Sequence, residues 1–189
     1  DYVHFWVRDG ALTVNECIYD DLPTKEMLDD YVSFSFTVQE TAIRIGRPAH
    51  ACFNIDGTAR SWGEQGDGPG LRILSILEIW DQLSDNAKLT ARKILVRDRD
   101  YIINNYNSDT DNAWEEITGK CFFSRSSQRH ALEKLENSQS KTGIEPEEKS
   151  PKIVQTLTTL LDEHWASNLG HYCSILDGKA KNGYLRGHE

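Results

Sequence analysis

The sequence lacks several features that would point to common classes of protein. No apolar run approaches the roughly 18 residues that a membrane-spanning helix needs. There is no surplus of positive charge, because 21 Lys and Arg stand against 30 Asp and Glu, for a net charge of −9. Phosphate backbones and anionic membranes repel such a chain. We therefore expect neither nucleic acid nor a membrane as its partner.

The chain also lacks metal-binding and redox signatures. Its four cysteines are far apart and form no C-x-x-C pair, which excludes the usual zinc and thioredoxin motifs. None of the six histidines forms a metal-spaced pair. We expect no metal and no cofactor. For Cys17, Cys52, Cys121 and Cys173, free buried thiols and disulfides both stay open.

The sequence says little about where the protein is found. It contains no N-x-S/T sequon and no signal-peptide pattern, and it begins with Asp1 instead of Met. We expect that the chain begins inside a longer precursor.

Apolar residues recur at three- and four-residue spacing through most of the chain, which predicts helices. Thr24 is the expected N-cap of the second helix, although its end, VSFSFTV, also alternates like a strand. No hairpin signal and no strand–helix alternation is present, so the predicted class is all-α, with antiparallel helix pairs. The predicted helices cover residues 9–21, 24–38, 69–80, 88–104, 122–135 and 150–165.

Two long segments separate these helices. Residues 41–68 are irregular and rich in glycine and proline, and compact domains rarely keep such a loop without a function. Residues 136–150 are rich in charge and predict a surface connection.

The sequence NAWEE, residues 112–116, places two carboxylates beside an indole. Cleaving an acetal requires a carboxylic acid that is still protonated near neutral pH. A hydrophobic wall and a like-charged neighbour both raise the pKa of a carboxyl group, and this segment contains both. The alternative is a solvated Glu115–Glu116 pair beside a half-buried Trp114 at a helix start.

The sequence FWVRDGAL, residues 5–12, places an arginine next to an aspartate. Arg8 offers a fork of donors and Asp9 a pair of acceptors, which suits sugar hydroxyls because each hydroxyl both donates and accepts. The alternative makes Asp9 a helix N-cap with Arg8 as its surface partner.

The sequence SWGEQGDGPGLR, residues 61–72, sets a tryptophan among glycines. The Trp62 ring offers a flat apolar face to the CH side of a pyranose. The alternative is a glycine-rich turn in which Trp62 fills the core and Asp67 caps the next helix. The segment lacks the Gly-Lys-Ser/Thr ending of a phosphate loop, so we exclude that function.

Taken in order, these three segments resemble the family 15 glycoside hydrolases, the glucoamylases. FWVRDGAL is similar to the family's Trp-x-Arg-Asp-x-Ala-Leu, and SWGEQGDGPGLR to its Trp-Gly…Gln…Asp-Gly-Pro-Ala-Leu-Arg. AWEEITGKCFFSRSSQRHAL is similar to its Leu-Trp-Glu-Glu…Phe-Phe…Gln-x-Arg-Ala-Leu. The match covers residues 1 to about 135.

The resemblance implies an (α/α)6 barrel, with about half of the barrel helices present and residues 1–189 forming part of one catalytic domain. It implies inverting exo-hydrolysis of α-1,4 bonds at the non-reducing ends of starch- or glycogen-type glucans and malto-oligosaccharides. It also implies a monomer when intact, and a secreted or vacuolar location.

The resemblance assigns roles to seven residues around one sugar-sized pocket. Glu115 is the general acid, Glu116 hydrogen-bonds sugar hydroxyls, Arg8 and Asp9 clasp the terminal glucose, Trp62 packs on the sugar and supports the acid, and Trp114 and Tyr2 line the pocket.

The sequence also departs from the family pattern. The family's general base and a further sugar-binding arginine lie in the C-terminal half of the barrel, and no matching segment occurs before Glu189. Asn112 replaces an acidic residue two positions before Trp114. The Trp62 segment is one residue short, with Glu64 in place of a basic residue.

Three functional hypotheses follow: a glucoamylase-like hydrolase whose general base lies outside this chain, a non-catalytic glucan-binding or regulatory module, or a plain helical interaction scaffold. The first two require Arg8, Asp9, Trp62 and Glu115 to lie around one concavity. The scaffold gains if these side chains lie apart.

Overall fold

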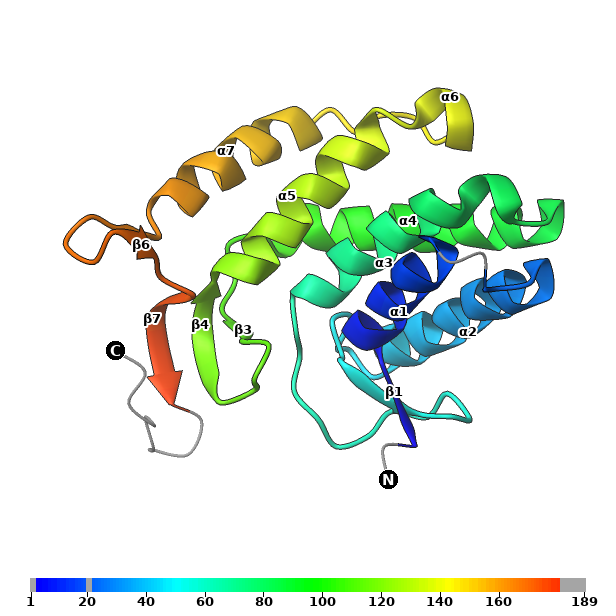
Figure 1. Cartoon of the computed structure of the whole chain (residues 1–189), viewed down its shortest axis with the longest axis horizontal. Coiled ribbons are helices and arrows are strands. Elements are labelled where there is room, and N and C mark those ends of the chain that lie inside the picture. Colours follow the sequence, from blue (N-terminus) through cyan, green and yellow to red (C-terminus); the bar gives the residue numbers. More distant parts are fainter. Residues whose placement is uncertain (1–2, 20–21, 181–189) are drawn as a thin grey trace.

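The computed structural model describes residues 3–19 and 22–180. Helices dominate the described chain, and short strands lie at one end of them (Figure 1). None of the described helices is long and apolar enough to cross a membrane. The helices are α1 (Val7–Tyr19), α2 (Lys25–Arg44), α3 (Asp67–Ile79), α4 (Asp85–Asn105), α5 (Phe122–Glu136), α6 (Gln139–Thr142) and α7 (Ser150–Asp162), with a 3-10 turn η1 (Trp80–Gln82) after α3.

Helix α3 is the centre of the molecule. It packs against α1 on one side and α5 on the other, while α4 packs against both α3 and α2, and α7 against α5. Its buried residues belong to the main hydrophobic cluster, which also contains buried residues of α4, α5 and α7. The amino-terminal ends of α1, α3 and α5 all point to the side where β1 and the β3–β4 hairpin lie (Figure 1).

A glycine permits the close packing of α3 on α5. A Cβ atom added to Gly70 would lie 2.9 Å from the carbonyl carbon of Ser127. Real Cβ atoms do not approach backbone this closely, so any side chain at this position would push the two helices apart.

A buried polar network ties α2, α3 and α4 together. Arg72 on α3 donates two hydrogen bonds to the Asp98 carboxylate on α4, Nε to Oδ2 at 2.7 Å and Nη2 to Oδ1 at 2.6 Å. Gln39 on α2 donates from Nε2 to Asp98 Oδ1 at 2.9 Å. Because both charges are almost fully buried, each depends on the other for compensation.

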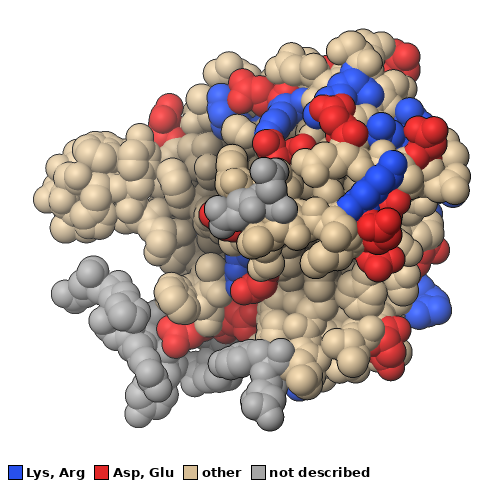
Figure 2. Space-filling view, turned by 45° about the vertical axis from the view of Figure 1, so that its right-hand side comes forward, with Lys and Arg blue, Asp and Glu red and all other residues tan. Residues whose placement is uncertain are grey.

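Within the described residues, the strands form three small antiparallel sheets. β1 (His4–Trp6) pairs with β2 (Cys52–Asn54), β4 (Ile117–Cys121) pairs with both β3 (Thr110–Asp111) and β7 (Ile175–Ala180), and β5 (Trp165–Ala166) pairs with β6 (His171–Tyr172). The β5–β6 hairpin contains no charged residue and forms the tan lobe at the left of Figure 2, whereas charges of both signs mix over the helical body.

Most of the predicted helices are confirmed. Thr24 caps α2 by accepting a hydrogen bond from the Met27 amide, and the VSFSFTV stretch is helical. Helix α3 begins at Asp67, two residues before Pro69. The residues between α2 and α3 are mainly irregular, as predicted, and contain only β2 and two isolated bridges.

Two predictions of local structure were wrong. The expectation of no hairpin fails at β3–β4 and at β5–β6, because strands of two to five residues are too short to show a period. Helix α7 ends at Asp162, so Trp165 belongs to β5 and not to that helix. The connection over 136–150, predicted to lie at the surface, has mostly exposed residues, contains α6 and buries Ile144 in the core cluster.

Truncating Asp98 should destabilise the fold strongly. Asp98→Ala would leave the Arg72 guanidinium buried without a counter-charge, and we expect the free energy of unfolding to fall by roughly 3–5 kcal/mol. Urea denaturation measures this value. Glu78→Ala is the control, because Glu78 pairs with Lys134 at the exposed surface, where such pairs contribute about 1 kcal/mol or less. Equal losses in the two variants would contradict the assignment.

Candidate active site

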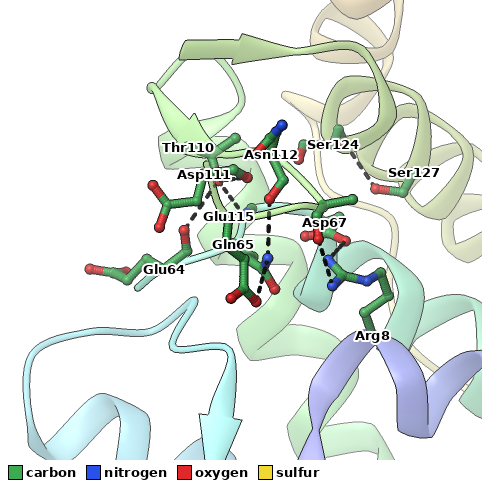
Figure 3. Close-up of polar contacts among 12 residues, drawn as sticks. Arg8, Glu64, Gln65, Asp67, Thr110, Asp111, Asn112, Glu115, Ser124 and Ser127 are labelled. Carbon is green, nitrogen blue, oxygen red and sulfur yellow. Dashed lines mark hydrogen bonds and ion pairs between the residues drawn. The ribbon is translucent and has the colours of Figure 1, made fainter. Parts of the chain in front are cut away.

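Arg8, in the segment FWVRDGAL, is hydrogen-bonded to both of the other sequence motifs. It lies in the first turn of α1 and donates from Nη1 to Oδ2 of Asp67, in the first turn of α3, at 3.1 Å (Figure 3). Its Nη2 donates to the carbonyl oxygen of Ala113 at 3.2 Å. Ala113 directly precedes Trp114 in the turn between β3 and β4, so the guanidinium holds that turn against both helices.

Gln65, in the segment SWGEQGDGPGLR, connects this second motif to the carboxylate predicted to act as the acid. Its Nε2 lies 3.2 Å from Oε1 of Glu115 and 3.2 Å from the carbonyl oxygen of Asn112 (Figure 3). Gln65 is only 2% exposed, and Glu115 is partly buried. The donor is therefore fixed by its surroundings, and it fixes the carboxylate in turn.

The turn that carries Glu115 is built around Asn112. Its Oδ1 accepts hydrogen bonds from the amides of Glu116 at 3.0 Å and Ile117 at 3.2 Å, and its carbonyl accepts from the Glu115 amide at 2.9 Å. These bonds let Glu115 adopt a positive φ of 62°, which is uncommon for a residue with a side chain. The departure from the family pattern at Asn112 thus has a structural role: its side chain shapes the turn.

The loop that carries Gln65 is tethered from both sides. The amide of Gly66 donates to Oγ1 of Thr110 on β3 at 2.7 Å. The carbonyl of Gly66 accepts from Nε2 of Gln128 on α5 at 2.8 Å. The donor to Glu115 is thereby connected to the same hairpin and to the helix that follows it.

Trp62 lies beside this group on the β1–β2 side. Its half-buried ring meets Trp6 edge-to-face with ring centroids 6.0 Å apart, and the Arg60 guanidinium lies 5.8 Å from its centroid. Among the described residues, the hydrogen bond to the Glu115 carboxylate comes from Gln65 and not from Trp62.

Cys52 lies beneath the site and shows which charges gather there. Burial raises the pKa of its thiol, the neighbouring Arg60 lowers it, and the negative charges of Glu115 and Asp9 raise it. Asp9, the expected clamp residue, and Glu115, the expected acid, therefore both act on one buried thiol, which places them on the same side of the molecule.

Asp67 is a buried carboxylate that depends on Arg8. Burial raises the pKa of Asp67, and the charge and hydrogen bond of Arg8 act in the opposite direction. The partial positive charge at the amino-terminal end of α3 also favours a carboxylate in its first turn.

The structure brings most of the predicted site residues together. Arg8, Asp9, Trp62 and Glu115 lie around one end of the helices, although Asp9 is in the first turn of α1 and not at its N-cap. Tyr2 lies outside the described residues.

The two remaining site residues lie on the turn between β3 and β4. Trp114 and Glu116 are solvent-exposed, and Trp114 reaches 84% exposure. The alternative of a half-buried Trp at a helix start is therefore wrong. This turn does not lead directly into a helix, and the indole is free to meet a ligand.

Sequence reasoning missed two residues that organise this site. Gln65 and Asp67 are part of the matched motif, but Gln65 received no role and Asp67 only that of a helix cap. The signal lay in their positions, since both flank the start of α3 and lie within five residues of Trp62. Their partners are 50 and 59 residues away, so the contacts depend on the tertiary fold.

The part of the chain that the structure describes contains no set of ligands for a metal ion. No group of three or more His, Cys, Asp or Glu residues comes together in a way that would hold an ion.

Replacing Arg8 should destabilise the fold in a pH-dependent way. Arg8→Met leaves the Asp67 carboxylate buried without its partner, and we expect a loss of roughly 3 kcal/mol in unfolding free energy near pH 7. Because the pKa of Asp67 is raised in the folded state, the native chain binds more protons than the unfolded chain. Stability therefore increases as the pH falls toward the ordinary aspartate range, and the deficit of the variant shrinks there.

Chemical denaturation at pH 7 and pH 4 measures this effect. Arg47→Met is the control, because Arg47 and its partner Glu64 are each about 40% exposed. A deficit that is the same at both pH values would argue against a buried, unpaired Asp67.

Comparison with known proteins places this arrangement in a family. Residues 1–179 match glycosyl hydrolases family 15. The chain is 31% identical over 163 residues to the intracellular sporulation-specific glucoamylase of Saccharomyces cerevisiae, covering 71% of this chain and 29% of that protein. It is 28% identical over 205 residues to glucoamylase-1 of Schizophyllum commune, covering 97% of this chain and 34% of that protein.

Solved structures give the same result for the fold. The family 15 glucoamylase from Hypocrea jecorina superposes with a TM-score of 0.79 at 22% identity, over 96% of this chain and 33% of that one. The expected class, a helical barrel of which only part is present, is confirmed. The chain spans about a third of the length of the curated relatives. It belongs to glycosyl hydrolases family 15.

Proposed function

We propose that this chain carries the acid and the sugar clamp of a glucoamylase-like hydrolase, which releases glucose from the non-reducing ends of α-1,4-linked glucans with inversion. In this proposal Glu115 protonates the glycosidic oxygen. Arg8 and Asp9 clasp the hydroxyls of the terminal glucose, and Glu116 binds hydroxyls at the cleavage point. Tyr2, Trp62 and Trp114 supply ring faces for the sugar.

The observation that carries the proposal is the pair of bridges between motifs. Arg8 of the first motif binds the turn that holds Glu115, and Gln65 of the second motif binds the Glu115 carboxylate itself. Gln65 lies 50 residues before Glu115, and Arg8 lies 105 residues before Ala113 in the same turn, so two distant segments support one acid. A plain helical scaffold gives no reason for this convergence.

The inverting step sets a requirement beyond this acid. A second carboxylate must activate water on the opposite face of the sugar, about 6.5–9.5 Å from the acid. We expect that base on a segment outside this chain, in the remaining two thirds of the length that the relatives have. The intact protein is therefore the object for kinetic tests.

Glu115→Gln should nearly abolish hydrolysis. The amide keeps the shape of the side chain but has no proton to transfer, so we expect the rate of glucose release from maltose to fall by about 10²–10⁴-fold. An aryl α-glucoside whose phenol leaves readily needs less acid assistance, so its rate should fall far less. Glu148→Gln, at an exposed glutamate, serves as the control.

The outcomes separate the enzyme from its rivals. Wild-type glucose release that disappears in Glu115→Gln supports the proposal. Unchanged starch hydrolysis in this variant would refute the role of Glu115. Binding of malto-oligosaccharides by the wild type without any turnover would favour the non-catalytic glucan-binding module.

Gln65 should act as a positioning residue for this acid. Gln65→Leu keeps a buried side chain of similar length but removes the donor to Glu115 and Asn112. We expect kcat for maltose to fall about 10–100-fold with little change in KM, because small displacements of a catalytic group are costly. The deficit should again be smaller for the aryl glucoside, whereas a purely structural defect would affect both substrates equally. Gln155→Leu, at an exposed glutamine of α7, is the matched control.

A further inference from the structure

A buried histidine joins the β5–β6 hairpin to the helical body. His164 lies between the end of α7 and the start of β5, and its side chain is fully buried. The hairpin that follows it, residues 165–172, forms the uncharged lobe that projects from the body in Figure 2.

Both ring nitrogens of His164 have a hydrogen-bond partner. Nη1 of Arg125 on α5 lies 3.1 Å from Nε2, and the carbonyl oxygen of Cys173 lies 2.9 Å from Nδ1. A guanidinium group can only donate, so Nε2 must accept, and the ring proton must lie on Nδ1, which donates to the carbonyl. These contacts therefore require a neutral imidazole in a single tautomer.

Arg125 is held in place independently of His164. Its Nη1 also donates to the carbonyl oxygen of Leu160 on α7 at 3.1 Å, and its Nη2 donates to Oδ1 of Asn107 at 3.1 Å. The side chain is almost fully buried. The guanidinium charge therefore keeps its position if the imidazole moves.

The lobe has few other attachments to the helical body. Within the described residues, no hydrogen bond joins residues 165–172 to a helix. At the base of the lobe, the amide of Cys173 donates to the carbonyl of His164 at 2.7 Å. The Phe122 ring contacts the rings of both His164 and Tyr172, with centroids 5.3 and 5.2 Å apart. The position of the lobe thus depends mainly on His164 and on one aromatic ring.

The groups around His164 lower its pKa overall. Burial is the largest cause and lowers the pKa, the bond to the Cys173 carbonyl raises it, the charge of Arg125 lowers it, and that of Glu163 raises it. The bonded partners of the ring are a cation and a carbonyl, and neither neutralises a proton on Nε2. Further titratable groups act on the guanidinium of Arg125 from β7, from the loop before β3 and from β4: Asp177, Asp109 and Cys121.

We propose that His164 is a pH-sensitive switch: protonation of its Nε2 breaks the bond to Arg125 and releases the lobe, residues 165–172, from the helical body. The new N–H would point at an N–H of Arg125, and two positive charges would face each other in a buried site. Because Arg125 keeps its bonds to Leu160 and Asn107, the imidazole is the partner that moves, and the lobe moves with it.

The contacts after the lobe limit how far this release extends. The carbonyl of Ser174 accepts a hydrogen bond from the amide of Phe122 at 2.9 Å, and β7 pairs with β4 from Ile175 onward. We expect β7 to stay on the hairpin that carries Glu115, so the lobe opens without the candidate active site. The proposal rests on the contacts of His164 and does not depend on the proposed function.

Linkage gives the pH range and the size of the effect. In the open lobe the imidazole meets water and has an ordinary pKa of about 6.5, whereas the closed lobe lowers that pKa. Above this value both forms are neutral and the contact is fully present. Below it the open form takes up a proton first, so opening is favoured as the pH falls. From pH 7.5 to pH 5 the equilibrium constant for opening should rise by roughly 10–30-fold.

Amide hydrogen exchange of the full-length protein, followed by mass spectrometry, tests the proposal. We expect the protection factor of residues 165–173, which corrects for the intrinsic pH dependence of exchange, to fall by about 10–30-fold between pH 7.5 and pH 5. Residues 90–103 of α4 should keep their protection over the same range.

Two variants assign the effect to one imidazole. His164→Gln should remove most of the pH dependence, because its amide accepts from Arg125 and does not titrate. His171→Gln is the matched control, since it removes an exposed histidine of the lobe itself and should behave like the wild type.

Exchange of the imidazole C2 hydrogen with deuterium measures the protonation of His164 in the wild type, so this readout needs no variant that folds. His164 should stay neutral at pH 6, below the ordinary pKa of a histidine. A loss of protection in the lobe that His164→Gln abolishes and His171→Gln retains supports the switch. Equal losses in the wild type and His164→Gln, or in residues 165–173 and 90–103, would overturn it. So would a His164 that is protonated at pH 6 while the lobe stays protected.

Discussion

The candidate site depends on one guanidinium group. Arg8 lies at the start of α1, is hydrogen-bonded to a buried carboxylate at the start of α3, and donates to the backbone of the turn that carries Glu115. Without it, Asp67 would be a buried charge without a partner at the start of α3, and the β3–β4 turn would lose its bond to α1. The same group thus stabilises the fold and fixes the geometry of the site, so the two properties cannot vary independently.

The arrangement of helices explains why the polar groups gather at this end. The amino-terminal ends of α1, α3 and α5 lie on one side, and each contributes backbone N–H groups and a partial positive charge there (Figure 1). Carboxylates are favoured in such a field, and Asp9 and Asp67 occupy the first turns of α1 and α3. The close approach of α3 and α5 at Gly70 keeps these ends near each other.

The helices could be predicted from the sequence because their apolar faces repeat over many turns, and Thr24 marks one helix start by a local bond. The short sheets could not, since strands of two to six residues leave no clear period. At the candidate site, the motifs predicted roles for Arg8 and Glu115, and the fold bonds Arg8 to the turn that carries Glu115. The role of Gln65 could not be predicted, because it depends on a hydrogen bond to a residue 50 positions away in the sequence. Local patterns predict elements, whereas contacts between distant loops require the fold.

Under the proposed function, the division of labour within the intact enzyme follows from these contacts. The acid, its donor and the hydroxyl clamp are all mounted on α1, α3 and the hairpin that they hold, so the position of the acid relative to the terminal sugar is set within this chain. The distance from acid to base depends instead on how the remaining helices dock. Inversion tolerates only a limited range of that distance. A rigid acid side is therefore a condition for the reaction, and the buried Asp67 and Gln65 supply that rigidity.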